Sequence, residues 1–154
     1  MKGTFFQRIC INNCQYTLSN ILPKIQKAFQ DIRELSLETP ISEAFKCYHV
    51  LDGKLFEAYM ELKCEPIVAI IEPSMYTGKF DWARCPRPID ARDYVKEILH
   101  NVISVHSEVE RSSASANTSV VDRVMFRLVE SVCEEVNRLF CCISRMNSNG
   151  CIQV

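Results

Sequence analysis

Apolar residues recur three and four positions apart through most of this chain, and this spacing constrains the fold more than any other feature. Residues at such spacings share one face of an α-helix, and a helix with an apolar face buries it against a neighbour. Only four glycines and six prolines occur in 154 residues, which favours long helices over short strands joined by turns. The sequence therefore predicts an all-α protein.

The first half of the chain is predicted to form two helices. Residues 4–35 contain an apolar stripe, and Pro23 inside it should kink or restart the helix near Ser19-Asn20. Thr39-Pro40 is a typical helix start, and the second helix is expected to run to about residue 70, with a bend or an end at Pro66. The first stripe consists of Phe6, Ile9, Cys10, Cys14, Leu18, Ile21, Leu22, Ile25, Ala28 and Phe29.

Two further helices are predicted in the second half. Asp90 can cap a third helix that ends near Arg111. Ser119, followed by Asp122, resembles a capping box for a fourth helix that continues to about residue 146, and Asn149-Gly150 is expected to supply a left-handed stop. The apolar face of the third helix is Val95, Ile98, Leu99, Val102, Ile103, His106 and Val109. That of the fourth is Val121, Val124, Met125, Leu128, Val129, Val132, Val136, Leu139, Phe140, Ile143 and Met146.

Residues 72–89 are different, with three prolines, one glycine and three aromatic residues. Aromatic rings have much apolar surface to bury, so we expect an ordered loop whose Phe80-Asp81-Trp82 segment packs against the second and third helices. Lys79, Arg84 and Arg87 give the loop a small local excess of positive charge. This charge could bind an acidic partner or lipid headgroups. The small polar stretch 112–118 is expected to be a flexible connection. The predicted fold is one antiparallel bundle of four to five helices over residues 1–154.

Charge and hydrophobicity argue against nucleic-acid and membrane-spanning proteins. Lysine and arginine number 18 and aspartate and glutamate 19, so the formal net charge is −1 and no concentrated positive field is available for nucleic acid. The longest apolar run, Ile67 to Ile71, is far shorter than the roughly 20 residues that span a bilayer. The nine cysteines are odd in number and irregularly spaced, without an export signal before them, which predicts reduced thiols.

No arrangement of residues predicts catalysis or metal binding. Only three histidines occur, and His106, on the apolar side of its helix, is expected to be a core residue. Cys10 and Cys14 share a helix face, but small residues facing a core explain them better than a metal does, and no CxxC pair occurs. Glu108 and Glu110, like Glu134-Glu135, are interpreted as solvated helix faces, with Glu134 pairing with Arg138. We therefore predict no enzyme and no catalytic, cofactor-binding or metal residues. A cysteine-dependent enzyme stays as a third hypothesis, because a Cys/His pair can meet only in space.

Several segments together resemble the C-terminal helical region of exocyst component two, the Sec-five-type subunit, over about four-fifths of the chain. The matching stretches are Leu55-Phe56-Glu57-Ala58-Tyr59, Glu65-Pro66-Ile67-Val68, residues 72–82 (EPSMYTGKFDW), Arg92-Asp93-Tyr94-Val95-Lys96-Glu97, Val105-His106-Ser107-Glu108-Val109, residues 132–139 (VCEEVNRL) and Asn149-Gly150. The resemblance implies a rod-like subunit of stacked helical bundles that tethers secretory vesicles to the plasma membrane. It also implies other exocyst subunits as partners, a cytoplasmic location peripheral to that membrane, and neither catalysis nor a cofactor.

The sequence departs from the family in length. Family members are much longer, and their N-terminal immunoglobulin-like module, which binds a Ral-type small GTPase, has no counterpart here, so GTPase binding is not expected. Residues 150–154 resemble the start of another helix, and we expect the chain to be a fragment, a partial gene product or a short isoform with some apolar surface exposed. The alternative hypothesis is a free-standing helical adaptor unrelated to exocytosis.

Overall fold

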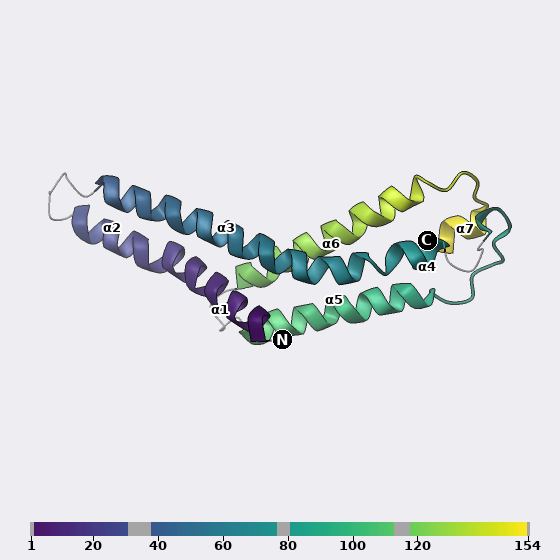
Figure 1. Cartoon of the computed structure of the whole chain (residues 1–154), viewed down its shortest axis with the longest axis horizontal. Coiled ribbons are helices and arrows are strands. Elements are labelled where there is room, and N and C mark those ends of the chain that lie inside the picture. The colour runs from purple at the N-terminus through teal and green to yellow at the C-terminus, as the bar shows by residue number, and fades with distance from the viewer. Residues whose placement is uncertain (1, 31–37, 77–80, 113–117, 154) are drawn as a thin grey trace. The chain divides into compact units, whose positions relative to one another are not determined.

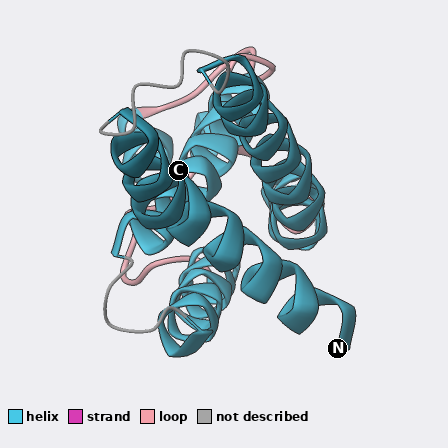
Figure 2. Cartoon of the chain, turned by 90° about the vertical axis from the view of Figure 1, so that its left-hand side faces the viewer, coloured by secondary structure: helices cyan, strands magenta, loops and turns pink. Residues whose placement is uncertain are grey.

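The computed structural model describes residues 2–30, 38–76, 81–112 and 118–153, and over these ranges it contains helices and connecting turns but no strand (Figure 2). The predicted all-α class is confirmed. The predicted flexible connection falls mainly on 113–117, and Lys79 and Phe80 of the aromatic loop also lie outside the described residues. The elements are α1 (Lys2–Tyr16), the π-helix η1 (Thr17–Ile21), α2 (Leu22–Gln30), α3 (Glu38–Val68), α4 (Ile71–Tyr76), the 3-10 helix η3 (Trp82–Arg84), α5 (Asp93–Ser112), α6 (Thr118–Phe140) and α7 (Ser148–Gln153).

The chain divides into two compact units. Unit 1 contains residues 1–61 and 109–122, and unit 2 contains residues 62–108 and 123–154. The long α3 contributes its first part to unit 1 and its last part to unit 2, and α5 and α6 also cross the boundary. The expected single domain over 1–154 stays a prediction.

In unit 1, α1 and α2 run antiparallel to the first part of α3 (Figure 1). The antiparallel direction places Cys14 in the electrostatic field of Asp52 and Tyr59 in that of Arg8. Burial, together with the nearby Asp52 carboxylate, raises the pKa of the Cys14 thiol. Arg8 and the side-chain amide of Asn12 on α1 also donate to Ser112, at the end of α5, at 3.0 and 2.9 Å. The buried side chains of α1, η1 and α2 are Ile11, Cys14, Leu18 and Leu22.

The predicted break near Ser19-Asn20 is present as a π-turn. Pro23 has no N–H, so the carbonyl of Ser19 cannot receive the usual bond from four residues ahead. The backbone widens there, and the N–H of Leu22 donates to the carbonyl of Thr17, five residues back. The helical path nevertheless continues, which keeps Leu18 and Leu22 on the buried face. Pro66 likewise lies inside α3, which ends at Val68 rather than near residue 70.

In unit 2, four cross-helix contacts define the helix directions. Lys63 pairs with Glu108 at 2.6 Å, and Arg92 donates to the carbonyl of Ser74 at 2.9 Å, so α5 runs antiparallel to the end of α3 and to α4. The Tyr76 hydroxyl donates to the carbonyl of Leu139 at 2.7 Å, and Arg138 pairs with Glu72 at 3.1 Å, so α6 runs in the same direction as α4. The core between these helices contains Ile67, Ile71, Met75, Ile98, Val105, Val124, Leu128 and Leu139.

Four predictions about helix limits in unit 2 and at its border are wrong. Residues 72–76 are helical in α4 rather than part of a loop. The third helix begins at Asp93, so Asp90 lies three residues before it and does not cap it. The Asp90 carboxylate instead accepts from the N–H of Ala91 at 2.8 Å and from Lys96 at 2.6 Å. The hydrogen bond from Lys96 lowers the pKa of Asp90. Ser119 is not a cap, because α6 already includes Thr118, and α6 ends at Phe140 instead of near residue 146.

The C-terminal segment differs from its prediction for a specific structural reason. Asn147 caps α7, because its side-chain oxygen accepts from the N–H of Gly150 at 2.7 Å, and its own N–H donates to the carbonyl of Trp82 at 3.0 Å. Gly150 therefore lies inside a helix and is not the predicted left-handed stop. A Cβ on Gly150 would lie 2.9 Å from the Trp82 carbonyl oxygen and 2.8 Å from Met146 Cγ, so close packing, not a turn, requires glycine.

Candidate protein-protein interface

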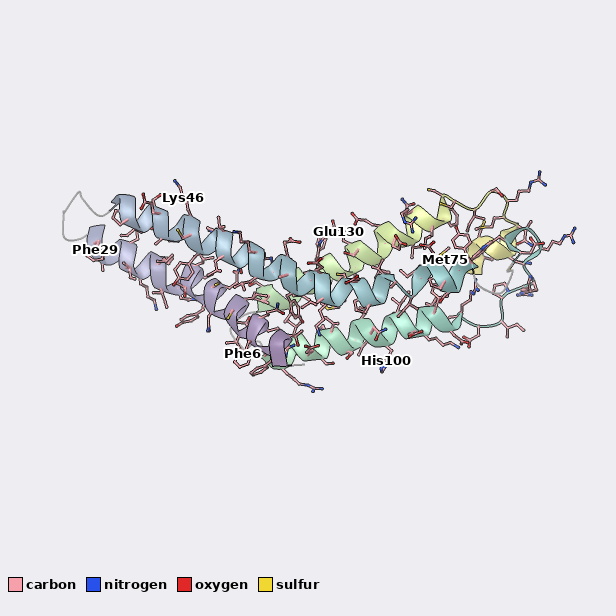
Figure 3. The ribbon with its side chains drawn as sticks, in the orientation of Figure 1. Phe6, Phe29, Lys46, Met75, His100 and Glu130 are labelled. Atoms are coloured by element: carbon pink, nitrogen blue, oxygen red, sulfur yellow. The ribbon has the colours of Figure 1, made fainter. Side chains whose placement is uncertain are left out.

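The titratable side chains form no reactive cluster among the described residues. His49 and His100 are exposed, and Figure 3 shows His100 projecting from α5 away from the other helices of unit 2. His106, expected in the core, is only half-buried. All nine cysteines are free thiols, and within 2–30, 38–76, 81–112 and 118–153 no three of His, Cys, Asp and Glu are grouped to hold a metal ion. Cys14 is buried but Cys10 is exposed, so the expectation that both face the core is wrong for Cys10.

The ion pairs also differ from the predicted ones. Arg138 pairs with Glu135 at 2.7 Å and with Glu72 at 3.1 Å, not with Glu134, because Glu135 faces α4 and Glu134 faces solvent. The hydrogen bond from Arg138 lowers the pKa of Glu135. Glu108, interpreted as part of a solvated face, is half-buried against Lys63. Charged groups on these flanks of α5 and α6 thus connect the helices of unit 2 to one another.

Trp82 is buried, as predicted, but Asp81 of the same segment is exposed. Trp82 lies at a junction with the C-terminal helix, which the prediction did not include. The guanidinium of Arg92 lies 5.5 Å from the ring centroid of Trp82 and 5.5 Å from that of Tyr94, a cation–π arrangement on two rings. The side-chain amides of Asn147 and Asn149 both donate to the carbonyl of Cys85, at 2.9 and 3.1 Å. These contacts order the segment from residue 81 onward, with α7 as its partner.

The apolar face of α5 is only partly buried. Ile98, Val105 and Val109 are in the core, whereas Leu99 and Ile103 are 55% and 63% exposed. With 100° between successive residues, Leu99 and Ile103 lie on the opposite flank of the buried stripe from Glu108, which contacts α3 through Lys63. The flank of α5 turned away from α3 is therefore apolar and accessible.

The same asymmetry occurs on α6. Val124, Leu128 and Leu139 are buried, and Arg138 on one flank contacts α4. Three large apolar side chains are exposed away from that contact. Val129 and Phe140, at 49% and 40% exposure, lie on the other flank of the buried stripe, and Phe126, at 72%, lies on the outer face of the helix. We call these three residues, together with Leu99 and Ile103 of α5, the apolar flank of unit 2. The helix faces predicted from the sequence include four of the five residues but not Phe126. A periodic pattern does not separate the covered part of an apolar face from the uncovered part.

A second surface feature lies where α4 meets α6. Val68, Ala69, Glu72, Pro73, Tyr76 and Glu135 line a shallow pocket of about 570 Å³. Its carboxylates converge on Arg138, and the Tyr76 ring is fixed by the hydrogen bond from its hydroxyl to the Leu139 carbonyl. We call this feature the acidic groove.

These surfaces are suited to binding protein, because exposed large apolar side chains beside ordered ion pairs are typical of interfaces. Burying one such side chain fully is worth about 1.5–3 kcal/mol, so five of them provide a substantial driving force for association. None of the helices described here is long and apolar enough to cross a membrane.

Comparisons with known proteins identify the family of this chain. The family model described as "Exocyst complex component Sec5" matches residues 6–154. Exocyst complex component 2 of Mus musculus is 38% identical over 94% of this chain and 15% of its own length. The Homo sapiens protein of that name is 37% identical over the same shares, and the Drosophila melanogaster protein is 30% identical over 97% of this chain and 17% of its own length.

The chain thus spans about one-sixth of the length of the curated relatives it matches. The search of solved structures gave no significant match. The family model nevertheless covers nearly every residue, including α5 and α6 with the apolar flank and the acidic groove. The chain belongs to the Sec5 family of exocyst complex components.

Proposed function

We propose that this chain is a non-catalytic part of the exocyst complex and contributes to the docking of secretory vesicles at the plasma membrane by helical protein–protein packing. Its partners in this proposal are other exocyst subunits, and its location is cytoplasmic and peripheral to the plasma membrane. Family membership and relatives named exocyst complex component 2 support the assignment to the complex.

The apolar flank of unit 2 is the observation that carries the proposal. Within unit 2, α5 and α6 each use one flank to contact the α3–α4 side through ion pairs. The opposite flank carries Leu99, Ile103, Phe126, Val129 and Phe140, which are 40–72% exposed. A surface of this kind gains free energy when another helix buries it, which is how bundles are completed.

Other features of the chain fit a role in recognition rather than in chemistry. The formal net charge is −1, which favours neither nucleic acid nor an anionic lipid surface. The buried Cys14 has a pKa raised by burial and by the Asp52 carboxylate, which makes its thiol less nucleophilic at neutral pH. A catalytic role, a cofactor and binding of a Ral-type GTPase are not part of the proposal.

Co-purification tests the proposal. The complete chain is co-expressed with the other exocyst subunits, and the subunits recovered with it are quantified. We expect the wild-type chain to recover them and the double variant Ile103→Glu/Phe126→Glu to lose at least nine-tenths of that recovery, because each carboxylate would have to be buried without a partner.

The matched control is Lys46→Glu/Lys54→Glu, which places two carboxylates at exposed positions of α3 in unit 1. Both variants replace exposed side chains, so circular dichroism should show unchanged helix content. Failure of the wild-type chain to recover any exocyst subunit, with a different partner recovered reproducibly, would support the alternative of a free-standing helical adaptor. Equal recovery by the flank variant and the control would refute the role of the flank.

A further inference from the structure

The acidic groove differs in chemistry from the apolar flank. Its floor is apolar and comes from the end of α3 and from α4, with the small Ala69 at a position that leaves room for a large side chain. Val68 and Pro73 complete this floor. The floor therefore offers apolar surface to an occupant.

The rim of the groove carries an excess of negative charge. Glu72 and Glu135 share the single guanidinium of Arg138. Glu65 lies one helical turn before Ala69, and Glu134 lies one turn before Arg138, and both are exposed and make no ion pair with the described part of the chain. The two carboxylates that line the groove and these two neighbouring ones, taken with Arg138, give a formal net charge of −3 at and beside the groove.

The walls of the groove favour an elongated occupant. One wall is the end of α3 with α4, the other is α6, and the two run in the same direction, as shown by the pairing of Glu72 with Arg138 and of Tyr76 with Leu139. A third helix can lie along such a groove with its apolar side chains on the floor and its polar flanks against the rims.

We propose that the acidic groove binds an amphipathic α-helix of a protein partner in which lysine or arginine residues flank a bulky apolar side chain. The apolar side chain lies on Ala69 and Pro73, and the cations lie against Glu65 and Glu134, where carboxylates have no cationic partner within the described residues. An acidic helix or an anionic membrane would be repelled by the same rim. The inference rests on the proposed function, because it gives the chemistry of one contact within the complex.

A synthetic peptide tests the recognition directly. The probe is an 18-residue leucine- and lysine-containing amphipathic helix with a fluorescent label, and its Kd for the complete chain is measured by anisotropy at low and high salt. Glu65→Gln/Glu134→Gln removes two rim charges and leaves the Arg138 bridge intact. We expect its affinity to fall about 2- to 30-fold, the range for two partly exposed ion pairs, and the difference from wild type to shrink at high salt.

A second substitution tests the floor independently of charge. Ala69→Trp fills the groove, and we expect it to weaken the peptide at least tenfold. The matched controls are Glu97→Gln on α5 and Ala58→Trp on α3, which change exposed residues outside the groove and should leave Kd unchanged. Peptide affinity that is unaffected by both the rim and the floor variants would overturn the inference.

Crosslinking tests the inference in the assembled complex. A benzophenone amino acid at position 69 is expected to capture a basic amphipathic segment of another exocyst subunit, identified by mass spectrometry. Capture of an acidic segment, of a second copy of this chain, or of nothing would overturn it. If Ile103→Glu/Phe126→Glu loses the subunits while the groove variants leave peptide affinity unchanged and position 69 captures nothing, this inference is refuted. The proposed function would then still stand.

Discussion

Replacing Gly150 with alanine should destabilise the C-terminal end of unit 2, although the same change normally stabilises a helix. Alanine is favoured over glycine in a helix interior by about 1 kcal/mol. At Gly150, however, the new Cβ would lie 2.9 Å from the carbonyl oxygen of Trp82, which is backbone and already accepts from Asn147. It would also lie 2.8 Å from Met146 Cγ, which can move at small cost.

The magnitude follows from these opposing effects. Overpacking a closely packed site costs about 1–3 kcal/mol, and the propensity gain offsets up to about 1 kcal/mol of it. We therefore expect Gly150→Ala to lower the free energy of unfolding by about 1–2 kcal/mol. Gly53 provides the internal reference, because a Cβ added to it inside α3 would have no atom within 4 Å, so Gly53→Ala should stabilise by about 1 kcal/mol.

Chemical denaturation followed by two probes distinguishes these outcomes. Circular dichroism reports all helices, and the emission of Trp82, the only tryptophan, reports the junction itself. We expect Gly150→Ala to shift the Trp82 emission to longer wavelength and to lower its transition midpoint, and Gly53→Ala to raise the helical midpoint. If Gly150→Ala were as stable as wild type with unchanged emission, the argument that the Trp82 carbonyl excludes a Cβ would be wrong.

Two further predictions concern titration and thiol reactivity. Burial raises the pKa of Tyr59 to about 12, so the folded chain holds this proton more tightly than the unfolded chain does. The free energy of unfolding should therefore fall by about 2–3 kcal/mol as pH rises from about 10 to 12. Tyr59→Phe should remove that part of the loss in denaturation curves measured across this pH range. Alkylation followed by mass spectrometry should show that Cys14 and Cys85 react most slowly of the nine thiols, because both are buried. One exposed thiol that reacts far faster than the other exposed thiols would instead favour a cysteine-dependent enzyme.

Several helix ends illustrate why local patterns predicted the elements more reliably than their boundaries. Pro23 acts on the carbonyl four residues before it, so the position of the break in the first helix followed from the sequence. Asp90, Ser119 and Gly150 are all residue types that occur at helix ends, but none of them occupies the predicted cap or stop. Their roles depend on Lys96, on how far α6 extends and on Trp82, which local patterns do not place.

The sequence predicted recognition through helix faces but not which part of each face is exposed. The absence of a reactive motif and the broad apolar faces of the third and fourth helices indicated recognition by helix packing. The exposed half of those faces depends on which flank contacts α3 and α4. That choice is made by Lys63 with Glu108 and by Arg138 with Glu72, pairs that lie 45 and 66 residues apart in sequence. The acidic groove needs the same long-range pairing.

Local sequence was sufficient to establish that this protein is helical and which residues share each helix face, because the 100° step between residues is a local property of the chain. Its ordered matches to the exocyst family also pointed to the family that the comparisons then showed. The packing of the helices was needed to learn that Leu99 and Phe126 stay exposed while Ile98 and Leu128 are buried, and that Gly150 faces the carbonyl of Trp82. Burial is a property of neighbours distant in sequence, and a periodic pattern shows that a face is apolar without showing what covers it.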